Sequence, residues 1–174
     1  QVVDSFTAPD GTLYEAVASA SGTGIIKTVT NADGTTTQTI LNAQKGQKKG
    51  TRDKKTGKFK NPAKKRFRYN ANKLQSEFAN FKSAAEAAAS STETVGYTDA
   101  NVVTGGSGFL KRDKASTVTL TDGAGNVIGT VGTNVGSDAF ETQAARTLAD
   151  EIVNINKGYL STIKTDDDDD DDDD

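Results

Sequence analysis

The sequence lacks four amino-acid types altogether: cysteine, histidine, methionine and tryptophan are absent from its 174 residues. Without cysteine there is no disulfide framework, thiolate nucleophile or thiolate metal site. Without histidine, no side chain ordinarily titrates near neutral pH, and the commonest ligand of transition metals is missing. The serines and threonines have no imidazole to activate them. We therefore expect no catalytic residues, no metal site and no cofactor, and we interpret the chain as a non-enzymatic protein.

Long hydrophobic runs and aromatic residues are also scarce. No apolar stretch approaches the roughly 18 residues that indicate a transmembrane helix, so we expect no membrane span. Aromatic residues make up only 6% of the chain. Outside residues 45–68 and 166–174, the chain is rich in glycine, threonine, alanine and serine. This composition favours short strands and many turns over a dense helical globule.

The net charge of −3 conceals two opposed blocks of charge. Nine consecutive aspartates end the sequence and contribute −9, so the rest of the chain carries +6. Like charges repel one another, and we expect this tail to be extended rather than folded. The tail is expected to contact basic residues of the same chain or of a neighbour; its members are Asp166, Asp167, Asp168, Asp169, Asp170, Asp171, Asp172, Asp173 and Asp174.

The basic block lies between Lys45 and Arg68. It holds 12 of the 21 basic residues and a single acid, which gives it a charge of +11. Glycines and a proline interrupt it, so we expect an extended loop at 44–70. Its cations suit phosphate groups, and the stretch 64–69 resembles the basic extensions that ribosomal and capsid proteins send into nucleic acid. The candidate contacts, to nucleic acid or to a neighbouring subunit, are Lys45, Lys48, Lys49, Arg52, Lys54, Lys55, Lys58, Lys60, Lys64, Lys65, Arg66 and Arg68.

Strand patterns dominate both halves of the chain. Runs at 12–18, 24–30 and 35–41 predict a β-meander over the first 43 residues. The Asp33–Gly34 pair between the second and third runs predicts a hairpin, because glycine accepts the positive φ of a tight turn. A second hairpin is predicted at 116–131, around a turn at 122–125.

Two amphipathic helices are predicted from apolar spacing. Residues 72–89 carry a stripe at 74, 78, 81 and 85, which is typical of one buried helix face. A second helix begins at Asp138, where Glu141 completes a capping box. Its apolar face holds 140, 144, 148, 152 and 155, and Lys157–Gly158 indicates its end. We expect a short edge strand at 159–163.

The string Thr-Gly-Gly-Ser-Gly-Phe-Leu at 104–110 resembles the nucleotide-binding turn of the extended short-chain dehydrogenase family. In that family the turn joins a strand to a helix whose N-terminus faces the cofactor pyrophosphate. Lys111 stands where the family has a third glycine, and a Thr/Val strand follows instead of a helix. We therefore interpret the string as a glycine-rich loop.

These patterns predict an α+β fold in which an antiparallel sheet of meander and hairpins is covered by two amphipathic helices. We expect a single domain over 1–165 that contains the basic loop, followed by the tail at 166–174. The favoured function is a structural subunit of a multi-chain assembly, as in a virion capsid or tail protein or an extracellular filament. Its partners are then copies of itself. The alternative is a nucleic-acid-binding protein whose acidic tail restrains its basic arm at 45–68.

Overall fold

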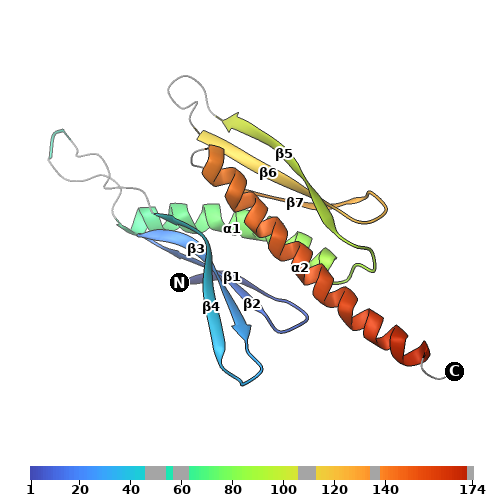
Figure 1. Cartoon of the computed structure of the whole chain (residues 1–174). Coiled ribbons are helices and arrows are strands. Elements are labelled where there is room, and N and C mark those ends of the chain that lie inside the picture. Colours follow the sequence, from blue (N-terminus) through green and yellow to red (C-terminus); the bar gives the residue numbers. More distant parts are fainter. Residues whose placement is uncertain (46–53, 57–62, 106–112, 134–137, 172–174) are drawn as a thin grey trace. The chain divides into compact units, whose positions relative to one another are not determined.

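The computed structural model describes residues 1–45, 54–56, 63–105, 113–133 and 138–171. Two antiparallel sheets and two helices form an α+β fold, which confirms the predicted class. The strands make two separate sheets rather than the expected single one (Figure 1). In chain order the elements are β1 (Val2–Thr7), β2 (Leu13–Ser19), β3 (Gly22–Thr30), β4 (Thr36–Lys45), α1 (Ala63–Ala88), β5 (Gly96–Gly105), β6 (Asp113–Thr121), β7 (Val127–Thr133) and α2 (Asp138–Asp171).

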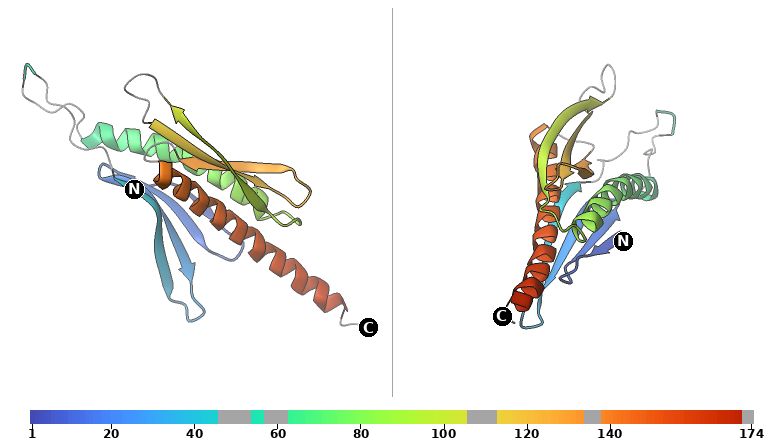
Figure 2. Two further views of the ribbon diagram at one scale, coloured as in Figure 1. Left: turned by 45° about the horizontal axis from the view of Figure 1, so that its top comes forward. Right: turned by 90° about the vertical axis from the view of Figure 1, so that its right-hand side faces the viewer.

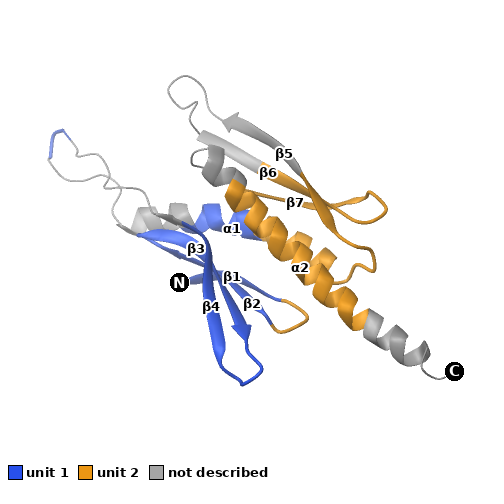
Figure 3. Ribbon diagram, viewed as in Figure 1, with its two compact units in different colours: residues 1–7, 12–78 blue, residues 8–11, 79–174 orange. Residues whose placement is uncertain are grey.

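The chain divides into two compact units, coloured separately in Figure 3. Unit 1 comprises residues 1–7 and 12–78, and unit 2 comprises residues 8–11 and 79–174. The boundary at 78/79 falls inside α1, so the helix contributes its first part to unit 1 and its second part to unit 2.

Unit 1 contains the predicted meander, a four-stranded sheet in the order β1-β2-β3-β4. Alternation along β2 buries Tyr14, Ala16 and Ala18 and leaves the residues between them partly exposed, as expected for a strand with one face in the core. The Phe6 and Tyr14 rings stack on the buried face, with centroids 6.2 Å apart. The strand β1 was not anticipated from the sequence.

The two predicted hairpin turns are confirmed and share one geometry. In the first, Gly34 N–H donates to Asn31 O at 3.0 Å and Asn31 N–H donates to Thr35 O at 2.7 Å. In the second turn, at 122–126, Gly125 N–H donates to Asp122 O at 3.1 Å and Asp122 N–H donates to Asn126 O at 2.9 Å. Gly34 and Gly125 have φ of +88° and +86°, which only glycine adopts without strain. This is a type I turn with a glycine bulge.

Unit 2 is a three-stranded sheet, β5-β6-β7, with α2 packed along it. Figure 2 shows α2 as one long helix that crosses this sheet. The core joins Val118, Leu120 and Val131 from the sheet to Leu148 and Ile152 from the helix, all at most 2% exposed. Burying each such side chain contributes about 1.5–3 kcal/mol. Of the stripe predicted for this helix, 144, 148, 152 and 155 are buried as expected; the side chain of Phe140 is outside the described part.

The first helix was predicted to begin at Asn72, and it begins nine residues earlier, at Ala63. The predicted stripe is confirmed, since Leu74, Phe78, Phe81 and Ala85 are all buried. The extra turns include Lys64, Lys65, Arg66 and Arg68, which we had placed in an extended loop. Alanine, lysine and arginine have high helix propensity, and the repulsion among these cations does not outweigh it.

The end of the second helix was also predicted wrongly. No strand forms at 159–163, because α2 continues through Gly158 to Asp171. Gly158 keeps a helical backbone, at a cost of about 1 kcal/mol relative to alanine, instead of ending the helix. The expected extended acidic tail is not observed: Asp166–Asp171 belong to α2, and residues 172–174 lie outside the described residues.

Candidate functional site

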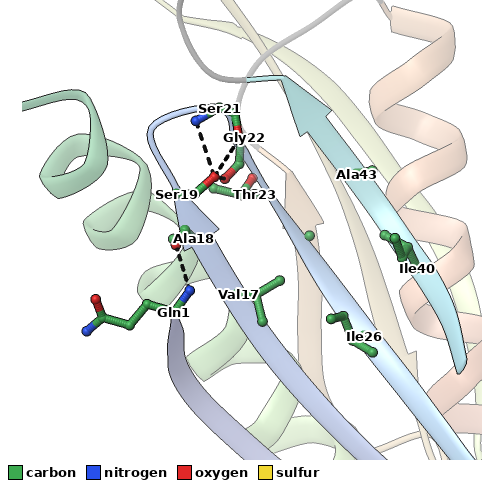
Figure 4. A pocket seen from close by; sticks show the side chains of 11 residues that line it. Gln1, Val17, Ala18, Ser19, Ser21, Gly22, Thr23, Ile26, Ile40 and Ala43 are labelled. Atoms are coloured by element: carbon green, nitrogen blue, oxygen red, sulfur yellow. Dashed lines mark hydrogen bonds between the residues drawn. The ribbon is translucent and has the colours of Figure 1, made fainter. Parts of the chain in front are cut away.

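The face of the four-stranded sheet opposite its core carries an apolar patch. Val17, Ile26 and Ile40 lie on neighbouring strands β2, β3 and β4, and Figure 4 shows them in one row across the sheet. Ile26 and Ile40 are directly paired across β3 and β4. Ile40 is 65% exposed, so a large apolar side chain of this patch lies in contact with solvent. We call the patch formed by Val17, Ile26, Ile40 and Ala43 the open face.

A shallow hollow of about 310 Å³ lies over the open face. Its floor is apolar and its rim is formed by hydroxyl-bearing residues of the β2–β3 turn (Figure 4). Ser19 and Ser21 hold that turn together, with their hydroxyl oxygens 2.7 Å apart. No charged side chain is among the lining residues, which are Gln1, Val17, Ala18, Ser19, Ser21, Gly22, Thr23, Gly24, Ile26, Ile40 and Ala43.

A bulge in β4 shapes one end of the hollow. The register between β3 and β4 shifts between Thr23 and Ile25, so Gly24 faces two residues of β4. One of them, Asn42, has a φ of +51°, a backbone conformation that asparagine tolerates better than most residues. A Cβ on Gly24 would lie 3.2 Å from Ile40 Cγ2. The glycine thus lets the Ile40 side chain lie close over the sheet.

The outer edge of β4 is the second part of the site. β4 is the last strand in the sheet order and has no described neighbour on its outer side. Residues 35–43 contain no charged residue and no proline. Natural edge strands are normally protected by charges, prolines or bulges, because their free N–H and C=O groups pair readily with another strand. We call Thr36–Ile40 the β4 edge.

The opposite edge, β1, does carry such protection. A bulge interrupts its pairing with β2 between Val2 and Asp4. The Asp4 carboxylate places a charge on this strand, and its Oδ1 accepts a hydrogen bond from Ser5 N–H at 2.8 Å. One backbone donor of β1 is thereby occupied within the chain itself. Both edge strands contain a bulge, but the β4 edge lies before its bulge and carries no charge, so it is better suited than β1 to accept a further strand.

The contacts predicted from the sequence lie in the two charged blocks, 45–68 and 166–174. Of the twelve candidate cations, five lie outside the described residues: Lys48, Lys49, Arg52, Lys58 and Lys60. Lys45 ends β4, and Lys64, Lys65, Arg66 and Arg68 lie in the first turns of α1. Lys54 and Lys55 lie in an exposed turn. Asp166–Asp171 form the last part of α2.

Two further features of the described structure bear on cofactor and metal binding. Thr104 and Gly105, where the dehydrogenase-like string begins, lie at the end of β5, and the next element is the antiparallel strand β6. A dinucleotide-binding turn requires a helix at that point. Asp150 is exposed on α2 and accepts a hydrogen bond from Tyr97 Oη at 2.7 Å. Within the described ranges, no three carboxylates gather in a way that would hold a metal ion.

Neither helix of the described structure is long and apolar enough to cross a bilayer. Comparisons with protein families, curated proteins and solved structures find no significant match to this chain.

The β4 edge and the open face were not predicted from the sequence. Its signal was present in the run Thr35-Thr36-Thr37-Gln38-Thr39-Ile40-Leu41, which is uncharged, β-branched and free of proline. Such a run indicates an adhesive strand when it lies at the edge of a sheet. Whether it lies at an edge depends on the order of the strands, and the run itself carries no information about that order.

Proposed function

We propose that this protein is a structural subunit of a multi-chain assembly. The observation that carries the proposal is the unprotected β4 edge beside the open face. An exposed strand edge of this kind offers main-chain hydrogen bonds, while a neighbouring apolar patch offers burial, and together they form a surface suited to another β-strand.

The sequence supports the same proposal from another direction. Two opposed charged segments, 45–68 and 166–174, have charges of +11 and −9. Segments of opposite charge on different copies attract one another, and contacts between exposed charges are weak singly and screened by salt. In the proposed assembly the sheet edge gives a specific contact, and the charged segments add a salt-sensitive one. A virion capsid or tail component, or an extracellular filament, is the class of protein we propose.

Size-exclusion chromatography with multi-angle light scattering tests the proposal on the full chain. We expect masses that are multiples of the single chain and that increase with concentration. The absorbance ratio at 260 and 280 nm across the peak separates this from the alternative. The chain has no tryptophan and only 4 tyrosines, so bound nucleic acid would dominate that ratio. A monomer at every concentration, with or without nucleic acid, would contradict the proposal.

A further inference from the structure

The backbone of β4 alternates between groups that bond to β3 and groups that face outward. Asn31 N–H donates to Thr35 O, and the register pairs Val29 with Thr37 and Lys27 with Thr39. In an antiparallel ladder hydrogen-bonded pairs recur at every second residue. The odd-numbered residues 35, 37 and 39 therefore bond to β3. Thr36, Gln38 and Ile40 direct their N–H and C=O groups away from the sheet.

These outward groups form a regular row that ends at the bulge. Beyond Ile40, the positive φ of Asn42 interrupts the strand geometry. The row is thus centred on Gln38. A second strand that pairs with it antiparallel about that centre would place Gln38 opposite its own counterpart and Ile40 opposite the counterpart of Thr36.

We propose that β4 of one copy pairs antiparallel with β4 of a second copy, related by a two-fold axis at Gln38, so that two four-stranded sheets join into one. This inference rests on the proposed function and names the contact within it. Because the axis is perpendicular to the sheet, the open faces of both copies lie on the same side of the joined sheet. The Ile40 side chains then flank the new strand pair on that side.

A second copy fits this edge better than other partners do. Thr36–Ile40 has no charge, so the strand meets no like-charge repulsion when it pairs with itself. It also presents no cation that would select a phosphate backbone. The β1 edge is less suitable as the partner strand, because it carries the Asp4 charge and its Ser5 N–H is occupied. A self-complementary contact about a two-fold axis is the commonest way in which identical chains associate.

The contact is expected to be weak on its own. It involves one strand and the apolar side chains next to it, whereas stable interfaces bury about 1,200–2,000 Å². An assembly with further contacts would reinforce it through increased effective concentration. The test should therefore be made over a wide range of protein concentration.

The first experiment compares Ile40→Lys with Val127→Lys in the full chain, by sedimentation velocity. Val127 is the matched control for Ile40, since the two side chains are 64% and 65% exposed and each lies on the last strand of its sheet. A charge on an edge strand prevents pairing. We expect Ile40→Lys to raise the dissociation constant by about tenfold or more and Val127→Lys to leave it unchanged. Equal unfolding midpoints of the monomeric variants will show that the fold is intact.

The second experiment uses the absence of cysteine from the chain. A single Gln38→Cys substitution places two thiols on the two-fold axis, where opposed strand residues are about 5.5 Å apart between Cα atoms, within the range of a disulfide. We expect a disulfide-linked dimer on mild oxidation. Ser5→Cys, on the β1 edge, is the matched control and should remain unlinked.

The outcomes separate this inference from the proposed function. If the wild-type chain assembles but Ile40→Lys assembles equally well, the inference is overturned and the structural role stands. If Gln38→Cys forms links only when mixed with Ser5→Cys, the strands pair head to tail and the two-fold contact is wrong. If the wild-type chain is a monomer throughout, both fail.

Discussion

Asn156 and Val95 are joined by a buried hydrogen bond that ties α2 to the segment preceding β5. Val95 N–H donates to Asn156 Oδ1 at 2.9 Å, and the two residues are 2% and 0% exposed. The two N–H groups of the Asn156 amide are shared among the carbonyls of Ala88, Ser91 and Glu93, which lie at 3.1, 3.4 and 3.2 Å from the nitrogen. One side chain thus satisfies backbone groups at the end of α1 and along the connection after it, which a helix end otherwise leaves unpaired.

Replacing Asn156 with alanine should destabilise the protein strongly. The substitution removes the acceptor of the buried Val95 N–H and the donor to three backbone carbonyls, and a buried group left without a partner costs about 1–3 kcal/mol. We expect a loss of about 2–4 kcal/mol in the free energy of unfolding, measured by urea denaturation. Asn154→Ala is the control, since Asn154 is exposed on the same helix. Equal effects of the two substitutions would show that the hydrogen bonds of Asn156 contribute little.

Gly129 on β7 allows a close approach of α1 within unit 2. A Cβ at this position would lie 2.8 Å from the Ala84 Cβ and 3.3 Å from its Cα, which is well inside van der Waals contact. We expect Gly129→Ala to cost about 1–3 kcal/mol through overpacking. The double variant Gly129→Ala/Ala84→Gly should recover part of that loss, after allowance for the lower helix propensity of glycine. Strict additivity in this double-mutant cycle would argue against the contact.

Gly158→Ala tests the corrected course of α2. Gly158 lies inside the helix, and a Cβ there meets no atom within 4 Å. Alanine should therefore stabilise the protein by about 0.5–1 kcal/mol, because glycine is the poorer helix former. Had this residue ended the helix in a left-handed conformation, alanine would be destabilising instead. The sign of the change in the urea midpoint distinguishes the two cases.

The Asp33 carboxylate should titrate below its ordinary range. The Thr35 hydroxyl at 2.6 Å and then the Thr35 N–H at 3.0 Å stabilise the charged form and hold the pKa of Asp33 below 3.8. Because the folded pKa lies below the unfolded one, this turn contributes stability above pH 3.8 that is lost as the pH falls through the folded value. Carboxyl-detected NMR titration should show the depressed pKa and its rise in Thr35→Ala. An unchanged pKa in that variant would contradict the assignment.

Added salt should weaken the contact between the charged segments of the proposed assembly and leave the contact at the β4 edge in place. Attraction between the basic and acidic segments is screened when the Debye length falls from about 10 Å at 0.1 M salt to about 3 Å at 1 M. Backbone pairing and apolar burial at the β4 edge are not weakened in this way. We expect larger species to dissociate with added salt while a dimer persists, as seen by light scattering. Complete dissociation to monomers at high salt would assign the main contact to the charged segments.

Local patterns predicted those elements whose signals are local. The Asp33–Gly34 turn lies between β-branched runs, and the stripe from Leu74 to Ala85 follows a single helix face, so both were identified correctly. Gly158 shows the limit of such reasoning. Its cost in a helix interior is only about 1 kcal/mol, and the strength of the helix on either side determines whether it ends the helix.

The candidate site depends on relations that a single strand does not encode. The exposure of Ile40 and the free groups of Thr36, Gln38 and Ile40 follow from the position of β4 at the end of the sheet order. The Asn156 contacts likewise join residues more than 60 positions apart in the chain. Charge, by contrast, is visible directly in the sequence. The segments 45–68 and 166–174 can therefore be recognised as candidate contacts without a structure.

Amide hydrogen exchange at the β4 edge tests most directly whether β4 forms the contact between copies. In the isolated chain the outward N–H groups of Thr36, Gln38 and Ile40 are free to exchange with water, whereas those of Thr37 and Thr39 bond to β3. As the protein concentration rises, we expect new protection at all three outward groups, and loss of that protection in Ile40→Lys. Exchange at Thr36, Gln38 and Ile40 that stays fast in the assembled state would show that β4 is not the contact between copies.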